Sequence, residues 1–297
     1  MTAEAELAAA YTGTRPRLVR LAYAVLGSHS EAEDVVSECW TRMTAAHARE
    51  PIRDVEAWAT VAVARYALDT LRSARVRRET YVGQWLPEPL VRDVAPVADP
   101  ADRVTLDESV GFALLVVLET LSPAERTAWV LHDLFRVDFR EVAQVVGRTP
   151  AAVRQLASRA RKHVAAGVPR VAVDRSEHAA AVAAFRRATA DGDLAALMAV
   201  LDPTATLTSD GGGEVNAARR PVRGADKVAR FVIGSAGKLG AGLSVRQVEV
   251  NAAPGLAVVD EDRRVIAVLA LSTDRGLITR IDIVLSPSKL AGRTLDG

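Results

Sequence analysis

The chain has 297 residues, of which 49% are apolar and 25% charged, which excludes an intrinsically disordered protein and predicts two or three folded domains. Its apolar stretches, such as Val265–Leu271, are too short to cross a membrane, and its acidic, alanine-rich N-terminus lacks the basic and apolar segments of a signal peptide. Cys39 is the only cysteine, which excludes an intramolecular disulfide and a cysteine-based metal cage, so we expect a cytoplasmic protein without a metal or cofactor.

The net charge of +1 conceals two basic tracts. Residues 65–78 hold five arginines and one acid, and residues 148–175 hold six arginines, one lysine and one acid. Two separate basic tracts in a nearly neutral chain are what binding to a nucleic-acid phosphate backbone requires. The alternative is that both tracts are solvated helix faces.

Residues 1–78 are predicted to be entirely helical. A helix rich in Leu, Val and Ala covers Arg15–Gly27, and Ser30 with Glu33 has the spacing of a capping box for a second helix. Asp54 can cap a third helix that runs to about residue 78, because no glycine or proline interrupts that stretch.

Residues 79–104 are predicted to form an extended interdomain linker. Gly83 and four prolines break any regular element in this segment. The segment nevertheless carries Tyr81, Trp85 and Leu86, and exposed aromatic side chains favour a surface to lie against.

Residues 105–168 are predicted to be helical again. Ser122, Pro123 and Glu125 supply an N-cap, a first-turn proline and a capping-box acid for one of these helices.

A helix-turn-helix is predicted within Asp138–Val164, where a short helix, a turn at Gly147 and a second helix follow one another. One arc of the second helix is apolar, and the opposite face is basic without any acid, which suits insertion into the major groove of DNA. An ordinary amphipathic surface helix is the alternative, but such a helix would usually mix charges of both signs. The residues expected to contact DNA from this motif are Arg148, Thr149, Arg154, Gln155, Ser158, Arg159, Arg161 and Lys162.

Residues 176–297 are predicted to form an α+β domain with an antiparallel sheet. Two helices, at 176–190 and 194–200, precede the sheet, and a third helix at 225–235 interrupts it. Alternating segments bounded by Gly, Asn and Asp predict strands at 205–209, 244–251, 256–260, 265–272 and 278–285.

Several motifs within residues 10–166 resemble the sigma-70 family of RNA polymerase subunits, and they occur in the order and at the separation found in that family. The motifs similar to region 2 are Leu21–Gly27, Ala32–Glu38, Ala57–Arg65 and Ala67–Arg72, and those similar to region 4 are Leu121–Arg126, Glu141–Ala143 and Arg154–Arg161. The chain lacks the long extra regions of housekeeping sigma factors, so the resemblance is to the extracytoplasmic-function class.

This resemblance implies a protein that binds core RNA polymerase and recognises the −10 and −35 elements of promoter DNA, with residues 1–78 as region 2 and residues 105–168 as region 4. In the family, the helix that corresponds to the one carrying Glu31, Asp34, Val35 and Glu38 docks on the polymerase clamp, and a solvated acidic face is the alternative. The arginines expected to bind the phosphates of the opening duplex are Arg65, Arg72, Arg75, Arg77 and Arg78.

Residues 176–297 resemble the SnoaL-like branch of the cone-shaped α+β fold that is shared with ketosteroid isomerase, and a subgroup of these sigma factors carries such a fusion. Tyr81–Leu90 and Ser209–Val215 resemble that subgroup's linker and glycine-rich signatures. Two positions depart from its pattern: Glu214 stands where the family usually has Lys, and Ser286–Leu290 replaces an Asn-Pro-Asp-Lys-Leu-like end.

The linker is predicted to contact this appended domain and thereby to set the spacing of the two DNA-binding blocks. Three consecutive glycines after a strand let another backbone approach closely, although a flexible loop is the alternative. The residues expected to meet are Tyr81, Trp85 and Leu86 on the linker and Asp210, Gly211, Gly212 and Gly213 on the domain.

Two other functions remain as alternatives. A ligand-sensing helix-turn-helix regulator would dimerise on palindromic DNA and act without binding core polymerase. An enzyme fused to a DNA-binding module would need a positioned base and donors for an oxyanion. Residues 176–297 contain no tyrosine or tryptophan and a single histidine, His178, so we expect no catalytic residues there even though Asp210, Asp260 and Asp282 are potential bases. The sequence does not define whether a small molecule binds this domain.

Overall fold

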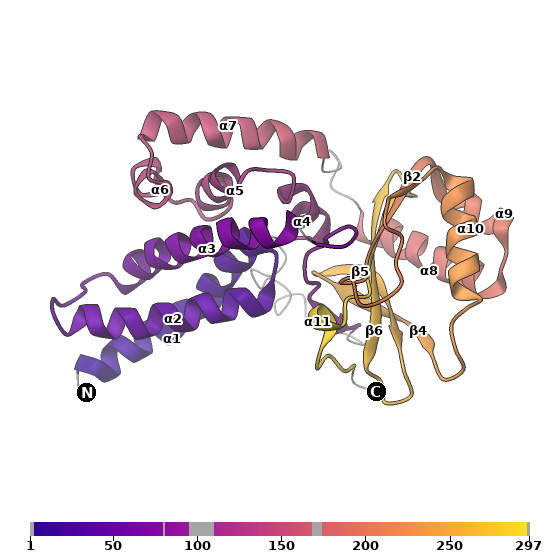
Figure 1. Cartoon of the computed structure of the whole chain (residues 1–297), viewed down its shortest axis with the longest axis horizontal. Coiled ribbons are helices and arrows are strands. Elements are labelled where there is room, and N and C mark those ends of the chain that lie inside the picture. Colours follow the sequence, from indigo (N-terminus) through magenta and orange to yellow (C-terminus); the bar gives the residue numbers. More distant parts are fainter. Residues whose placement is uncertain (1–2, 80, 95–109, 168–173, 296–297) are drawn as a thin grey trace. The chain divides into compact units, whose positions relative to one another are not determined.

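The structure, a computed structural model, describes residues 3–79, 81–94, 110–167 and 174–295. These residues form two compact units (Figure 1). Unit 1 consists of residues 3–79 and 114–167, and unit 2 consists of residues 81–94, 110–113 and 174–295. The described part of the predicted linker therefore belongs to the same unit as the C-terminal domain. Among the described residues, no helix is both long and apolar enough to cross a membrane.

Unit 1 begins with three helices, α1 (Ala3–Leu26), α2 (His29–His47) and α3 (Val55–Glu79), and α1 packs against the other two. Their shared core consists of side chains that are almost completely buried, among them Leu18, Leu21, Val36, Met43 and Leu68. Burying one such side chain contributes about 1.5–3 kcal/mol, so packing rather than intrinsic helix propensity holds these helices together.

The start of α1 lies earlier than the predicted Arg15. Leu7 and Tyr11 are buried and extend the apolar face of the helix towards its N-terminus. The Tyr11 hydroxyl also donates to the Val36 carbonyl at 2.6 Å, which joins this added stretch to α2.

The N-cap of α2 is Ser28, so the predicted capping box of Ser30 and Glu33 is wrong. Gly27 ends α1 with a left-handed φ of 72°, and the extended Ser28 that follows accepts the Glu31 amide on its hydroxyl at 3.3 Å. Glu33 forms an ion pair with Arg15 instead. The predicted cap of α3 is confirmed, because Asp54 Oδ1 accepts the Ala57 amide at 2.9 Å.

The second part of the helical region contains α4 (Phe112–Leu118), α5 (Pro123–Trp129), a π-helical turn η2 (Val130–Leu134), α6 (Phe139–Val146) and α7 (Pro150–Gly167). The predicted capping box at the start of α5 is confirmed: Ser122 Oγ accepts the Glu125 amide at 3.3 Å, and Glu125 Oε2 accepts the Ser122 amide at 3.2 Å. Gly147 ends α6 with a φ of 69°, so α6 and α7 have the predicted helix-turn-helix layout.

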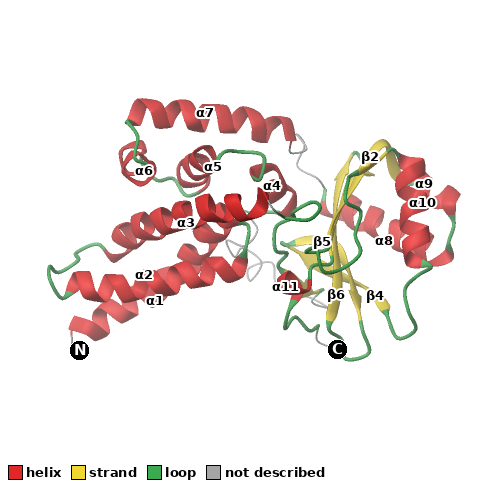
Figure 2. Ribbon diagram, in the orientation of Figure 1, coloured by secondary structure: helices red, strands yellow, loops and turns green. Residues whose placement is uncertain are grey.

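Unit 2 is an α+β unit built on one sheet with the strand order β1-β4-β5-β6-β7-β2-β3. Helices α8 (Arg175–Asp191), α9 (Leu194–Ala199) and α10 (Ala225–Ala236) pack against one face of the sheet (Figure 2). The core between them includes Phe185, Leu197, Leu207, Val228 and Ile281. The strands are β1 (Val91–Asp93), β2 (Leu201–Asp210), β3 (Val222–Arg223), β4 (Ser244–Val250), β5 (Ala253–Val259), β6 (Val265–Asp274) and β7 (Leu277–Val284).

The sheet differs from the predicted one in two respects. β2 and β7 pair in parallel, whereas every other strand pair described is antiparallel, and a local alternation pattern does not encode the direction of a distant partner. β1, β3 and the short helix α11 (Pro287–Leu290) were not predicted, because they span four residues or fewer. β1 comes from the proline-rich linker and pairs with β4 at the edge of the sheet, with Arg92 opposite Glu249.

Candidate nucleic-acid interface and linker site

The basic face of α7 is exposed along its whole predicted length. Val153, Ala157 and Ala160 are buried on the opposite side, against α5 and α6. The exposed side chains of this face are Arg154, Gln155, Ser158, Arg159, Arg161 and Lys162. An α-helix that is supported on one side and exposes arginines and a glutamine on the other can enter a DNA major groove.

Three arginines of this face have partners within unit 1. Arg159 Nε lies 2.9 Å from Glu125 Oε1, and Arg161 Nε lies 2.5 Å from Asp133 Oδ1. Arg154 lies over the Phe139 ring, with its guanidinium carbon 5.3 Å from the ring centroid. Ion pairs that are this exposed contribute little stability, so a phosphate can replace the acid at small cost.

The turn between α6 and α7 gives the other two predicted DNA contacts different surroundings. Arg148 is exposed directly after Gly147. The Thr149 hydroxyl accepts the Ala152 amide at 3.2 Å, so this side chain caps α7. Thr149 therefore has a structural role that its assignment to DNA contact did not anticipate.

The arginine tract of α3 is not a uniform free surface. Arg65, Arg72 and Arg75 are exposed, and Arg78 is half-buried; the side chain of Arg77 lies outside the described part of the chain. Arg72 pairs with Asp69 at 3.2 Å on its own helix. The other three reach across to the second part of unit 1: Arg65 to Gln144 O (3.4 Å), Arg75 to Leu121 O (3.2 Å) and Arg78 to Glu119 Oε2 (2.5 Å).

The acidic helix α2 presents only part of its predicted polymerase-binding set. Asp34 and Glu38 are exposed, and Glu31 is half-buried. Val35 is buried in the core of the bundle and offers almost no surface to a partner. Glu38 pairs with Arg42 at 2.7 Å on the exposed side of the helix.

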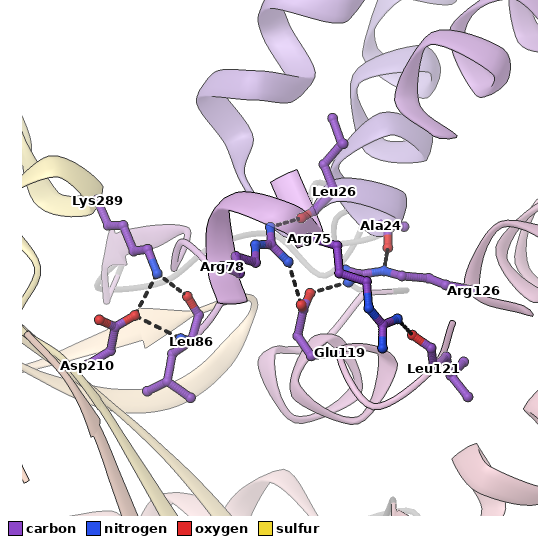
Figure 3. Close-up of polar contacts among 10 residues, drawn as sticks. All are labelled: Ala24, Leu26, Arg75, Arg78, Leu86, Glu119, Leu121, Arg126, Asp210 and Lys289. Carbon is purple, nitrogen blue, oxygen red and sulfur yellow. Dashed lines mark hydrogen bonds and ion pairs between the residues drawn. The ribbon is translucent and has the colours of Figure 1, made fainter. Parts of the chain in front are cut away.

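In unit 2, Asp210 joins the linker to the end of β2. Its Oδ1 accepts the Tyr81 hydroxyl at 2.6 Å and the Gly212 amide at 3.0 Å. Its Oδ2 accepts the Leu86 amide at 2.8 Å and the Lys289 ammonium at 2.6 Å (Figure 3). Lys289 Nζ also donates to the Leu86 carbonyl at 2.5 Å, so both backbone polar groups of Leu86 are held.

The Asp210 ion pair is buried, and hydrogen bonds satisfy it. The Asp210 side chain has 0% exposed surface and that of Lys289 has 12%. A buried ion pair is stable only where further hydrogen bonds replace the lost water, and Asp210 receives three in addition to that from Lys289. The ammonium lies 4.1 Å from the centroid of the Trp85 ring and 5.4 Å from that of Tyr81, within cation–π range. Burial, together with the Asp210 carboxylate, raises the pKa of the Tyr81 hydroxyl.

The glycines after Asp210 are needed for this approach. Gly212 and Gly213 have left-handed φ values of 70° and 77°. A Cβ at Gly212 would lie 2.6 Å from Ser286 Oγ, which is too close, whereas a Cβ at Gly213 would make an ordinary contact of 3.5 Å with Cβ of Val82, so the positive φ alone favours glycine there. Gly211 is buried, and its carbonyl accepts the Val215 amide at 3.0 Å, which closes a tight turn. The structure thus brings Tyr81, Trp85 and Leu86 together with the Asp210–Gly213 segment.

Three contacts of the linker had not been identified from the sequence. Lys289 lies in a segment that departs from the family pattern, and Glu88 is half of an ion pair with Arg293 at 2.7 Å. Asn251 holds two points of the chain at once: its Oδ1 accepts the Leu90 amide at 3.0 Å, and its Nδ2 donates to the Val110 carbonyl at 3.2 Å. The available sequence signal was an asparagine between two predicted strands, since asparagine favours the left-handed conformation that Asn251 adopts here, with a φ of 48°.

No group of three His, Cys, Asp or Glu side chains that could hold a metal ion occurs within the described residues.

Comparison with known proteins defines the class first. Residues 10–77 match the family model for sigma-70 region 2, and residues 111–164 match the model for sigma-70 region 4. These two matches cover the α1–α3 bundle and the helix-turn-helix with its supporting helices.

Whole-chain relatives then define the family. The chain is 40% identical over 294 residues to the ECF RNA polymerase sigma factor SigJ of Mycobacterium tuberculosis, covering 96% of this chain and 93% of SigJ. It is 36% identical over 290 residues to the probable ECF RNA polymerase sigma factor SigI of the same species, covering 96% and 94%. The crystal structure of M. tuberculosis SigJ superimposes with a TM-score of 0.75 at 36% identity, covering 96% of this chain and 98% of that one. The chain belongs to the extracytoplasmic-function sigma factors.

These comparisons confirm the sequence-based assignment to the sigma family. They also confirm two helical sigma regions, and the structure shows that an α+β domain follows them, in a chain that SigJ matches along nearly its full length. As a sigma factor, the protein binds core RNA polymerase and promoter DNA and acts in transcription initiation.

Proposed function

We propose that this sigma factor directs core RNA polymerase to its promoters through the exposed faces of α3 and α7, and that the SnoaL-like domain controls this activity by holding the linker. In this proposal α3 and the α2–α3 segment bind the −10 region, and α7 binds the −35 element. Asp34 and Glu38 of α2 contact the polymerase. The protein acts in the cytoplasm, where core polymerase is found.

The observation that carries the regulatory part is the integration of the linker into unit 2. The linker supplies strand β1 of the sheet, and the buried Asp210 carboxylate binds both Tyr81 and Leu86. Residues 81–93, held on unit 2 in this way, have few conformations available to them, whereas the same residues in a free linker would sample many. The −10 and −35 elements lie at a set spacing on promoter DNA. Whether the domain holds or releases the linker therefore affects whether regions 2 and 4 can bind both elements at once.

We further propose that the SnoaL-like domain acts without catalysis. His178 is buried on α8, and both of its ring nitrogens have partners, at Thr273 Oγ1 (2.8 Å) and the Pro254 carbonyl (2.9 Å). Asp210 is occupied by the linker, and Asp260 caps a turn by accepting the Arg264 amide at 2.8 Å. These contacts give His178, Asp210 and Asp260 structural roles, and the third potential base, Asp282, is paired with Arg280.

Run-off transcription with core polymerase on the DNA upstream of the protein's own gene tests this function. The full chain is expected to start transcription at a discrete site, and Trp85→Ala is expected to change the amount of transcript while both units stay folded. The matched control is Leu239→Ala, which truncates an exposed side chain of unit 2 away from the linker. Equal transcript from wild type and Trp85→Ala would contradict the regulatory role of the linker.

Gel filtration with core polymerase separates this function from its main alternative. A sigma factor co-elutes with core enzyme, whereas a ligand-sensing repressor elutes alone as a dimer and binds palindromic DNA. Substitution of both Asp34 and Glu38 by Lys is expected to weaken co-elution, and Glu4→Lys, an exposed change on α1, is expected to leave it unchanged.

A further inference from the structure

Two arginines of unit 1 pair with one carboxylate near the C-terminal end of α1, and a third arginine binds a backbone carbonyl two residues further on. Arg78 Nη1, from α3, lies 2.5 Å from Glu119 Oε2, and Arg126 Nη1, from α5, pairs with Glu119 Oε1 (Figure 3). One carboxylate therefore receives one guanidinium from each sigma region, since α3 belongs to region 2 and α5 to region 4. Arg75 of α3 donates to the Leu121 carbonyl at 3.2 Å, two residues beyond Glu119.

The same guanidinium groups also bind the end of α1. Arg126 Nε donates to the Ala24 carbonyl at 3.1 Å, and Arg78 Nη2 donates to the Leu26 carbonyl at 3.0 Å. The last carbonyls of a helix lack intrahelical donors and carry a partial negative charge, so they favour cations. The Glu119 cluster, defined here as Arg75, Arg78, Glu119 and Arg126, thus fastens region 4 to two helices of region 2.

Glu119 shares its charge between two guanidinium groups, those of Arg78 and Arg126, and the side chain of Arg126 is only 1% exposed. Arg126 Nη2 is buried without a hydrogen-bond partner among the described residues. Glu119 itself is 19% exposed and Arg78 16%, so the Arg78–Glu119 pair lies at the border of the interface and not deep within it.

We propose that the Glu119 carboxylate competes with DNA phosphates for the arginines of α3. In the closed state, in which region 4 packs on region 2, Glu119 binds Arg78; promoter DNA ends this state when its phosphates bind Arg75 and Arg78 instead. This inference rests on the proposed function, in which the arginines of α3 bind promoter DNA. A phosphate offers guanidinium groups the same bidentate geometry as a carboxylate, and it carries its charge on an already polyanionic strand.

Replacement of Glu119 by a phosphate weakens the packing of region 4 on region 2. If a phosphate draws Arg78 away from Glu119, the closed interface loses the contact that joins α3 to Glu119. The Arg75–Leu121 hydrogen bond lies on the same side of α3, so a phosphate that reaches Arg75 removes the second contact as well. Arg126 and Glu119 both belong to region 4 and stay paired, so the Arg126 hydrogen bond to the Ala24 carbonyl is the contact of this cluster that remains, and region 4 is held less firmly on region 2. DNA binding by α3 and release of region 4 from region 2 therefore favour each other.

The test compares Glu119→Gln with Asp69→Asn in the full chain. Both variants remove one negative charge that pairs with an arginine of α3, but Asp69 pairs with Arg72 on the exposed side of the same helix and joins nothing across the interface. Binding to a fluorescent forked duplex is measured by anisotropy over a range of salt concentrations. Glu119→Gln is expected to tighten binding about 3–10-fold and to steepen the salt slope by about 1 to 2, because one or two further arginines reach phosphates. Asp69→Asn is expected to change affinity less than 2-fold.

A distance measurement in the same variants reports the closed state directly. Dyes on Ser37→Cys in α2 and Ala165→Cys in α7 label exposed positions of the two regions, and the native Cys39 is buried. Forked DNA is expected to lower energy transfer in wild type, and Glu119→Gln is expected to lower it without DNA. Glu119→Asp, which keeps the charge, is expected to stay close to wild type in both measurements. Because Gln keeps the shape of Glu and Asp keeps its charge, equal effects of Glu119→Asp and Glu119→Gln would show that the charge of Glu119 does not hold this state, which would overturn the inference.

Arg72→Ala separates failure of this inference from failure of the proposed function. If Arg72→Ala and Arg78→Ala both leave forked-DNA binding by the polymerase complex unchanged, the arginines of α3 do not bind DNA and the proposed function is wrong. If both weaken that binding while Glu119→Gln behaves like Asp69→Asn, only the competition by Glu119 is overturned.

Discussion

Two carboxylates, Asp210 in unit 2 and Glu119 in unit 1, each hold together segments that are far apart in the sequence. Asp210 binds one lysine, one tyrosine hydroxyl and two backbone amides, so the charge of its site is balanced and every contact is directional. Glu119 binds two arginines, so one carboxylate is shared between two guanidinium groups. The two sites also differ in exposure, 0% for the Asp210 side chain and 19% for that of Glu119.

This difference separates a permanent contact from an exchangeable one. A balanced, buried ion pair with all its hydrogen bonds made leaves no favourable place for an outside ion, and removal of either partner strands a buried charge. At Glu119, two arginines share one carboxylate at the border of an interface, so a DNA phosphate can replace the carboxylate as the partner of Arg78. We therefore expect substitutions at Asp210 to change the stability of unit 2, and substitutions at Glu119 to change which state of unit 1 is populated.

The largest effect is expected for Asp210→Asn. This change strands the Lys289 ammonium, which is 12% exposed, and is expected to lower the free energy of unfolding of unit 2 by about 3–5 kcal/mol. Hydrogen exchange with mass spectrometry resolves the two units and should show faster exchange in residues 81–93 and β2, with unit 1 unchanged. Asp262→Asn, which alters an exposed pair with Arg264, is the control and is expected to stay within about 0.5 kcal/mol of wild type.

The double variant Asp210→Asn with Lys289→Met sharpens this result. If the loss arises from a stranded charge, removal of both charges is expected to recover part of the stability, since neutral replacements of buried pairs are often tolerated. A double variant as unstable as the sum of the two single variants would show that the sites act independently, and the contrast with Glu119 would fail.

A second, smaller effect is expected for Asn251→Ala. The Asn251 side chain joins Leu90 to Val110, and its loss leaves the half-buried Leu90 amide and the buried Val110 carbonyl without that partner. We expect a loss of about 1–3 kcal/mol, together with faster hydrogen exchange at β1. Asn216→Ala, an exposed position of the same unit, is the control. Unchanged protection of β1 would mean that its pairing with β4, and not Asn251, holds the linker.

The sequence predicted most elements of both units because their signals are local. The capping box of Ser122 and Glu125, the glycine that ends α6 and the one-sided charge of α7 each lie within a few residues of one another. The family motifs likewise gave the two sigma regions and the appended domain. The linker's aromatic residues and the three glycines pointed to the contact around Asp210.

The residues that complete these sites could not be predicted, because each depends on a distant partner. Lys289 stands about 200 residues after the linker that it binds, in a segment that departs from its family pattern. Glu119 reads as an ordinary acid between two helices until α3 brings Arg78 beside it. The error at Ser30 has a local cause: two serines two residues apart compete for one cap, and the conformation of Gly27 selects Ser28.

A third prediction concerns Glu125, a carboxylate of unit 1 whose surroundings are balanced. Its hydrogen bond from the Ser122 hydroxyl, aided by Arg159, lowers the pKa of Glu125. A lowered pKa in the folded state contributes stability above the unfolded pKa, near 4.5, which is lost as pH falls through the folded pKa. Ser122→Ala is expected to lower the stability of unit 1 by about 1 kcal/mol at pH 7 and to weaken this acid dependence. Urea unfolding at pH 3.5 to 7 measures both; Ser73→Ala, exposed on α3, is the control.

The smallest effect is expected at Asp282, a carboxylate of unit 2 that is as buried as Asp210 but has fewer partners. Arg280 Nε donates to its Oδ2 at 2.6 Å, and its Oδ1 is buried without a hydrogen-bond partner among the described residues. Burial raises the pKa of Asp282 despite the arginine, so folding favours the protonated acid, and stability falls as pH rises from about 3.8 through the folded pKa.

Asp282→Asn removes that penalty and is expected to keep unit 2 within about 1 kcal/mol of wild type at pH 7, in contrast to Asp210→Asn. The difference between variant and wild type is expected to shift in favour of the variant as pH rises above about 3.8 until the wild-type carboxyl is ionised, as measured by urea unfolding. A loss as large as that of Asp210→Asn would mean that burial alone, and not the number of partners, determines how much a carboxylate stabilises this unit.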